Sequence, residues 1–286
     1  MNELEFVARL RALPLHEGAR GLEDDCALIE LGGETLIITH DMMAEGTHFE
    51  PEAKMSDVAF KLVAMNLSDL ASKAAEPVGV LVGVTLGRDD ASFVNGLREA
   101  LVRFNVPLLG GDTIAATGPS TFGLTAVGRA TSPRVPSRTG ARAGDAVYMT
   151  GTIGCALLGF EGHEKHLTAF HRPTPRVEEG RALGPVVSAM MDISDGLLLD
   201  GWRMAKASGV TIRLNPELIP VASSQRFDDC VRWGDDYELL FTADPAAKLP
   251  VAATRIGTVE AADGDVPAYL GATALTDPGT LGYRHG

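Results

Sequence analysis

The stretch SDVAFKLVAMNLSDLASKAA, residues 56–75, carries the clearest periodic pattern in the chain. Apolar residues recur at positions 59, 62, 63, 67 and 70, on one side of a helix, and Ser56 is a residue type that caps helix starts. The pattern predicts a long amphipathic helix that opens at Ser56 and buries its apolar side. Asp69 lies within this helix.

Apolar and β-branched runs flank this helix and predict strands. They cover residues 26–31, 34–42, 78–86 and 120–130, and a second amphipathic helix is expected over 91–104. Residues 106–113, VPLLGGDT, predict a short buried strand that ends in a glycine turn. This mixed order of elements indicates an α+β fold in which helices pack on mixed sheets.

A second half of the chain follows residues 131–145, TSPRVPSRTGARAGD, where proline, glycine and arginine cluster and the apolar periodicity lapses. Beyond it, strands are expected at the start of 146–151, within 189–196, and at 210–214 and 238–243, with a helix over 197–208. We therefore predict two domains, residues 1–135 and 136–286.

The composition is that of a folded globular protein, since 45% of the 286 residues are apolar and 22% are charged. A formal net charge of −13 argues against a nucleic-acid partner, because such binding rests on clustered lysine and arginine. The three cysteines are too few and too dispersed for a disulfide framework, which favours a reducing compartment. The chain has no leader-like start and no run of 18 apolar residues, so we expect a cytoplasmic protein without a membrane partner.

Three aspartates fall where predicted buried strands emerge: Asp41 ends LIITHD, Asp112 follows LLGG, and Asp192 follows VVSAMM. Aspartate is costly to bury unpaired, so a group of them at strand ends needs cations or hydrogen-bond donors. Magnesium is one answer, because it prefers oxygen ligands from carboxylates and substrate phosphates. Taken singly, each aspartate is better explained as an ordinary turn residue.

Six short motifs occur in order over most of the chain: GLEDD at 21–25, THDMMAEGTHF at 39–49, NLSDLA at 66–71, GGDT at 110–113, MDISDGL at 191–197 and GDDYEL at 234–239. A lone GGDT or NLSDLA is weak evidence, whereas MDISDG between an upstream NLSDLA and a downstream DYEL is strong. From about residue 21 to residue 283 the chain resembles the thiamine-monophosphate kinase family, within the aminoimidazole ribonucleotide synthetase superfamily of ATP-binding enzymes.

The resemblance implies the site residues. Metal ligands would be Asp25, Thr39, His40, Asp41, Asp69, Asp112 and Asp192, with Asp195 holding a further ion. ATP would contact Gly111, Asp112, Arg138 and Ser194, and the acceptor would contact His48, Asp235 and Tyr283.

The resemblance also implies a two-domain aminoimidazole ribonucleotide synthetase-like fold, and a homodimer formed by N-terminal domains that bind ATP and several Mg²⁺ ions. The implied reaction is ATP-dependent phosphorylation of thiamine monophosphate to thiamine diphosphate. Phosphoryl transfer depends mostly on positioning and charge neutralisation, and the acceptor phosphate is already ionised. We therefore expect direct in-line transfer with no catalytic side chain acting as base or nucleophile.

The chain departs from the family pattern at several positions. Glu23 replaces a glycine, His40 a threonine and Asp235 a glutamate, and the segment between 159 and 173 is short. The histidines at 163, 166 and 171 fit an exposed loop better than a zinc site.

Two alternative functions stay open: another ATP-using enzyme of the same superfamily, and a catalytically weakened nucleotide-binding module. Selenium- and hydrogenase-maturation chemistry is disfavoured, because no cysteine lies near the N-terminus at a selenophosphate-type site or at the C-terminus as a carrier of a nitrile group. A P-loop is excluded, because no GxxxxGK[ST] sequence occurs.

Overall fold

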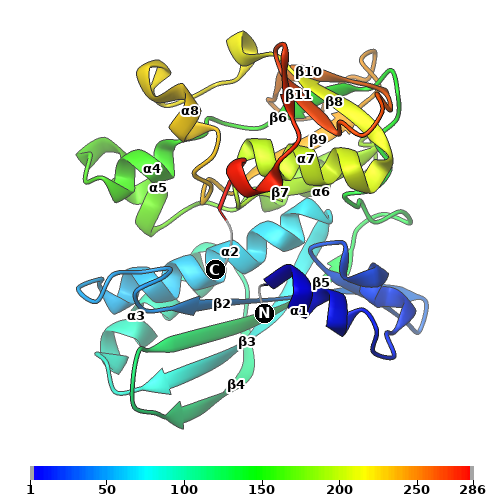
Figure 1. Ribbon diagram of the computed structural model, residues 1–286. Coiled ribbons are helices and arrows are strands. Elements are labelled where there is room, and N and C mark those ends of the chain that lie inside the picture. Colours follow the sequence, from blue (N-terminus) through cyan, green and yellow to red (C-terminus); the bar gives the residue numbers. More distant parts are fainter. Residues whose placement is uncertain (1–2, 284–286) are drawn as a thin grey trace.

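A computed structural model describes residues 3–283, which form two sheet-based halves stacked with helix α2 (Met55–Ser72) between them (Figure 1). The N-terminal sheet has the strand order β1-β2-β5-β3-β4. Its strands are β1 (Ala27–Leu31), β2 (Glu34–Ala44), β3 (Ala75–Leu86), β4 (Leu108–Ala115) and β5 (Thr121–Ala130). The remaining helices of this half are α1 (Glu3–Leu10) and α3 (Asp90–Arg103).

The C-terminal half is built on a sheet with the strand order β12-β11-β8-β10-β6-β9-β7. Its strands are β6 (Ala146–Met149), β7 (Ala189–Ile193), β8 (Val210–Leu214), β9 (Glu238–Ala243), β10 (Thr254–Ala261), β11 (Ala268–Leu270) and β12 (Thr273–Leu275). Its helices are α4 (Cys155–Phe160), α5 (Leu167–His171), α6 (Val177–Leu183), α7 (Leu197–Ser208) and α8 (Phe227–Cys230). The α+β fold class predicted from the sequence is confirmed.

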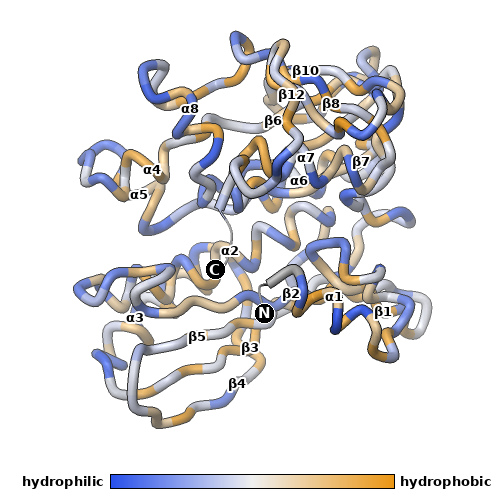
Figure 2. Tube along the Cα trace, in the orientation of Figure 1, coloured by the Kyte–Doolittle hydropathy of each residue, from blue (hydrophilic) through white to orange (hydrophobic). Residues whose placement is uncertain are grey.

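Helix α2 is the central element of the molecule. Leu62, Val63 and Leu67 on one side are fully buried in the core over the N-terminal sheet. Ala71 and the following Ala74 pack instead with α6 and residues of the C-terminal sheet. Because both halves cover it, α2 is buried nearly all round, whereas the most hydrophilic stretches of the trace lie in peripheral loops such as those near α5 and α8 (Figure 2).

The predicted start of α2 is wrong. The helix begins at Met55 after Lys54, and Ser56 lies inside the first turn without acting as its cap. The backbone N–H of Ser56 instead donates to the hydroxyl of Ser92, 3.2 Å away at the start of α3. Contact with α3 therefore replaces the side-chain cap.

The predicted strand ends are also wrong, because Asp41, Asp112 and Asp192 lie inside β2, β4 and β7. The pair Gly110 and Gly111 does not turn the chain but pairs in register with β3. β4 is an edge strand and its side chains are mostly exposed, so an aspartate there keeps its hydration. Strands β10, β11 and β12 were not predicted.

Within residues 3–283, the helices are all too short or too polar to cross a membrane.

Candidate active site

Three carboxylates from separate elements meet at the boundary between the two halves. Asp25 precedes β1, Asp69 lies on α2 and Asp192 on β7, and one oxygen of each lies within 4.8 Å of the others. Asp69 reaches this point because the same helix that fills the N-terminal core also faces the C-terminal half. We call Asp25, Asp69 and Asp192 the carboxylate cluster.

Hydroxyl groups are the donors to two members of the carboxylate cluster. Thr39 donates to Asp69, and Ser68 Oγ donates to Asp192 Oδ2 over 2.6 Å. Burial, followed by repulsion from nearby carboxylates, raises the pKa of Asp69 well above its ordinary value and that of Asp192 to about 8. Asp41 lies beside them, and burial raises its pKa to about 6. These side chains are costly to ionise until a cation compensates them.

Asp25, in contrast, has cationic partners that sequence reasoning missed. Lys73 is fully buried, and its Nζ lies 2.5 Å from Asp25 Oδ2 and 2.6 Å from Asp24 Oδ1. Arg138 Nε donates to Asp25 Oδ1 over 2.9 Å. Burial opposes ionisation of Asp25, but Arg138 and Lys73 outweigh it and hold the pKa of this carboxyl below its ordinary value. Asp25 is therefore the member of the carboxylate cluster whose ionised form is stabilised by the chain itself.

The chemistry of this donor set fits a hard divalent cation. Asp192 is buried and Asp69 partly buried; they repel each other and receive hydroxyl donors, while Lys73 and Arg138 are directed at Asp24 and Asp25. Carboxylate and hydroxyl oxygens are the ligands magnesium prefers, and a cation there would reverse the unfavourable electrostatics.

The turn after β7 gathers several predicted residues. The backbone N–H groups of Ser194 and Asp195 both donate to Asp200 Oδ2 over 3.1 Å. Arg203 Nη1 lies 2.5 Å from Asp195 and 3.0 Å from Asp200. Asp195 is therefore ion-paired here, and Asp200 and Arg203 are charged partners of this turn that the sequence did not single out. Both sit on α7, which looked like an ordinary amphipathic helix.

Two of the three predicted acceptor contacts reach the same turn. The backbone N–H of Asp235 donates to the carbonyl of Ser194 over 2.8 Å, and the backbone N–H of Tyr283 donates to the carbonyl of Asp195 over 2.9 Å. His48 lies in the turn after β2, where its Nδ1 accepts from the N–H of Ala44 over 3.1 Å. Their contacts to an acceptor stay predictions.

His40 and Asp112 are not brought to the carboxylate cluster within one chain. Thr39 and Asp41 face α2. Because side chains alternate along a strand, His40 lies on the opposite, outer face of the sheet. There its Nδ1 lies 2.8 Å from Thr125 Oγ1. Asp112 pairs in register with Gly83 on the same outer face. Its strand lies three positions from β2 in the sheet order, a lateral separation of roughly 14 Å.

Gly111 has a steric reason to be glycine, because an added Cβ would lie 2.0 Å from the carbonyl oxygen of Val82. The predicted ATP and metal roles of Gly111, Asp112 and His40 stay predictions.

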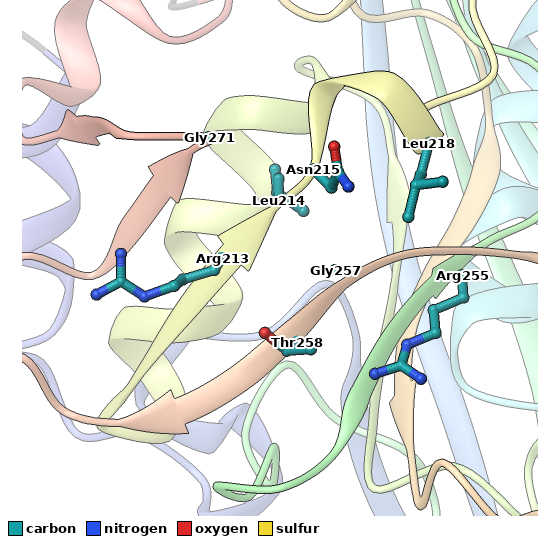
Figure 3. A pocket seen from close by; sticks show the side chains of 8 residues that line it. All are labelled: Arg213, Leu214, Asn215, Leu218, Arg255, Gly257, Thr258 and Gly271. Atoms are coloured by element: carbon teal, nitrogen blue, oxygen red, sulfur yellow. The ribbon is translucent and has the colours of Figure 1, made fainter.

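A separate cavity of about 520 Å³ lies in the C-terminal half, beside β8 and β10 (Figure 3). In Figure 3 the guanidinium groups of Arg213 and Arg255 point in different directions and do not meet. Arg213 is also paired with Glu260 over 2.6 Å. The cavity therefore offers no converging anion site, and β8 lies four strands from β7.

The raised pKa values predict how stability depends on pH in the absence of metal. The pKa is about 6 for Asp41 and about 8 for Asp192 in the folded state, against 3.8 without these neighbours, so the folded state binds more protons at neutral pH. The free energy of unfolding should therefore fall as pH rises from about 4 to about 8. Urea denaturation in EDTA at several pH values measures this slope.

Magnesium should reverse the trend, because the deprotonated carboxylates are the form that binds it. We expect the stabilisation by magnesium to grow with pH over the same range. High salt is the control, since it screens exposed charges but leaves a buried cluster largely unaffected. Equal stabilisation at low and high pH would contradict a metal site here.

Comparison with known proteins places the chain in a class. Residues 23–130 match the family described as AIR synthase related protein, N-terminal domain, and residues 142–268 match the corresponding C-terminal domain. The fold is therefore that of the AIR synthase-related proteins. A hydrogenase maturation protein, HypE in its complex with HypF, shares this fold at 18% identity with a TM-score of 0.73.

Relatives within that class are more specific. The chain is 36% identical to the thiamine-monophosphate kinase of Caulobacter vibrioides, covering 100% of this chain and 91% of the relative, and 33% identical to that of Escherichia coli, covering 93% and 91%. It superposes on AaThiL complexed with AMPPCP and TMP with a TM-score of 0.86 at 25% identity, covering 100% and 97%. The chain belongs to the thiamine-monophosphate kinase family, which confirms the resemblance seen in the sequence.

Proposed function

We propose that the protein transfers the γ-phosphoryl group of ATP to the phosphate of thiamine monophosphate, directly and with magnesium, to form thiamine diphosphate. The observation that carries this proposal is the carboxylate cluster at the boundary of the two halves, in a chain of this family. The related AaThiL structure was solved with AMPPCP, an analogue of ATP, and with TMP, which supports the same pair of substrates.

Asp25, Asp69 and Asp192 would hold magnesium, with Asp41 and Thr39 beside them. Bound magnesium would supply positive charge between two phosphate groups that otherwise repel by several kcal/mol, about 4 at contact distance. The chain's own residues prepare the magnesium ligands, because Lys73 and Arg138 keep the carboxyl group of Asp25 ionised.

No side chain needs to act as a general base in this reaction. An acceptor phosphate is already ionised at neutral pH, and its oxygen can attack the γ-phosphorus in line. Covalent transfer would need a carboxylate free to act as nucleophile. In the carboxylate cluster, Thr39, Ser68, Arg138 and Lys73 engage both oxygens of Asp25 and one oxygen each of Asp69 and Asp192. The remaining oxygens would be ligands of magnesium, which favours direct transfer.

A homodimer is part of the proposal, formed through the outer face of the N-terminal sheet. Large apolar side chains are exposed on this face and at the β4 edge, among them Met42 (56%), Leu109 (53%) and Ile114 (54%). Several large apolar side chains exposed on one face favour a contact site there. His40 and Asp112 lie on the same face, so a second copy would be needed to place them against a shared substrate.

Sedimentation velocity tests the dimer. The wild type should sediment as a dimer at micromolar concentration, and Ile114→Asp should shift it to monomer because a charge would be buried in the contact. The control is Val102→Asp, a still more exposed apolar position (76%, against 54% for Ile114) on α3, the helix that packs on α2. A monomeric wild type would contradict the dimer.

A kinase assay tests the function and separates it from its alternatives. Purified protein with ATP, magnesium and thiamine monophosphate should produce thiamine diphosphate, and thiamine without a phosphate should not be phosphorylated. ATP turnover that is independent of thiamine monophosphate would favour another superfamily activity. Binding of ATP without turnover of any kind would favour a weakened nucleotide-binding module.

A further inference from the structure

Lys61 is a buried cation that the carboxylate cluster does not use. It lies on α2 with a side chain only 6% exposed, and its Nζ lies 2.6 Å from Asp235 Oδ2 and 4.2 Å from the centre of the Phe170 ring. Asp235 belongs to the C-terminal half and is itself 32% exposed, so a ligand can reach the pair from that side. A buried ion pair adds little net stability, which points to another role.

The backbone around Asp235 is strained. Asp235 and Tyr237 have φ values of 59° and 52°, in the left-handed region that non-glycine residues rarely occupy. The β7 turn holds them there, since Asp235 N–H donates to Ser194 over 2.8 Å and Tyr237 N–H to Ile193 over 2.9 Å. Such strain clusters at ligand sites, where surrounding contacts maintain it.

The pair also lies next to the carboxylate cluster. Tyr237 OH donates to Asp235 Oδ1 over 2.9 Å. Tyr237 N–H donates to the carbonyl of Ile193, the residue after Asp192, so one tyrosine connects Asp235 to the cluster. Lys61 and Ser68 are seven residues apart on one face of α2, a rise of about 10.5 Å, and Ser68 donates to Asp192. Lys61 is therefore about two helical turns from the cluster.

We propose that Lys61 and Asp235 form an exchangeable ion pair within the acceptor-binding site: Lys61 binds the phosphate dianion of the acceptor, and Asp235, already a predicted acceptor contact, binds its cationic heterocycle. This inference rests on the proposed function and extends it to a residue outside the predicted site. In the free protein the two side chains compensate each other. An acceptor that carries both a phosphate and a positive charge replaces both partners, whereas an acceptor lacking either charge leaves one buried group unpaired.

Binding measurements on Lys61→Met and Lys61→Arg test this pairing, with Lys206→Met as the exposed lysine control. Calorimetric titrations would use thiamine monophosphate, thiamine and AMPPCP with magnesium, alongside KM for each substrate. Lys61→Met should weaken the binding of thiamine monophosphate about 10- to 100-fold, as expected for the loss of a hydrogen bond between charged groups. The affinities for thiamine and AMPPCP should change less than about threefold. Lys61→Arg should retain most of the affinity, and KM for ATP should not change.

An equal loss for thiamine and thiamine monophosphate, or a loss of AMPPCP binding, would overturn the inference in favour of a structural link between the halves. A wild type that binds AMPPCP but not thiamine monophosphate would overturn the proposed function itself, which is a distinguishable result. If circular dichroism shows that Lys61→Met is unfolded, Asp235→Asn is used as the test variant instead. Asp235→Asn should weaken the binding of thiamine and of thiamine monophosphate alike. Unchanged affinity for both compounds would refute the pairing.

Discussion

Replacing Asp192 by asparagine should abolish phosphoryl transfer and at the same time make the metal-free protein more stable. Asparagine has the same shape and can still accept the hydrogen bond from Ser68, but it cannot offer a charge to magnesium. Loss of one carboxylate ligand should lower kcat by roughly a thousandfold or more, about 4 kcal/mol of transition-state stabilisation. The loss should not be recovered by any attainable magnesium concentration.

The gain in stability follows from the same burial. The pKa of Asp192 is raised to about 8 when folded, against 3.8 when unfolded, so wild-type stability is lost as pH rises between these values. Near pH 8 the asparagine variant avoids this loss, and its Tm in EDTA should rise by several degrees, at roughly 2–4 °C per kcal/mol. Asp265→Asn, at an exposed position, is the control. Near-normal turnover in Asp192→Asn would refute the metal assignment.

The second large effect is expected at Lys73. Lys73→Met leaves Asp24 and Asp25 buried without the ammonium that lies 2.6 Å and 2.5 Å from them. Removing one partner of a buried ion pair costs about 3–5 kcal/mol, which corresponds to a fall in Tm on the order of 10 °C. Thermal unfolding followed by circular dichroism measures it.

A double variant separates charge from packing at this position. Adding Asp24→Asn to Lys73→Met removes one of the two uncompensated charges and should recover part of the lost stability. Lys248→Met, on an exposed lysine, should leave Tm unchanged. A Tm of Lys73→Met equal to that of the wild type would show that Asp24 and Asp25 are compensated by other groups.

Local patterns in the sequence identified the elements that carry the site. The α2 periodicity placed Asp69 on a helix, and the apolar run before Asp192 predicted the strand that carries it, although Asp192 lies inside β7 and not after its end. The outcome at Ser56 shows the limit of such patterns, because a tertiary contact with Ser92 on α3 took the place of the expected cap. The edge position of β4 likewise allowed Gly110 and Gly111 to stay extended.

The charged partners could not be predicted, because they depend on contacts between distant parts of the chain. Lys73 reads as an ordinary helix-terminal lysine, yet 48 residues separate it from Asp25. Lys61 and Asp235 are 174 residues apart and meet only once the two halves pack on α2. Sequence spacing carries no information about such pairs, whereas the aspartates predicted to bind metal were named through the family resemblance of short motifs.

A single-turnover experiment with γ-labelled ATP tests the central claim most directly. Protein is mixed with labelled ATP and magnesium, with and without thiamine monophosphate, quenched at early times, and both the protein and the small molecules are counted. Direct magnesium-assisted transfer predicts label in thiamine diphosphate, at a rate that depends on magnesium, and no label on the protein at any time. Stoichiometric label on the protein that moves into thiamine diphosphate when the acceptor is added would contradict it.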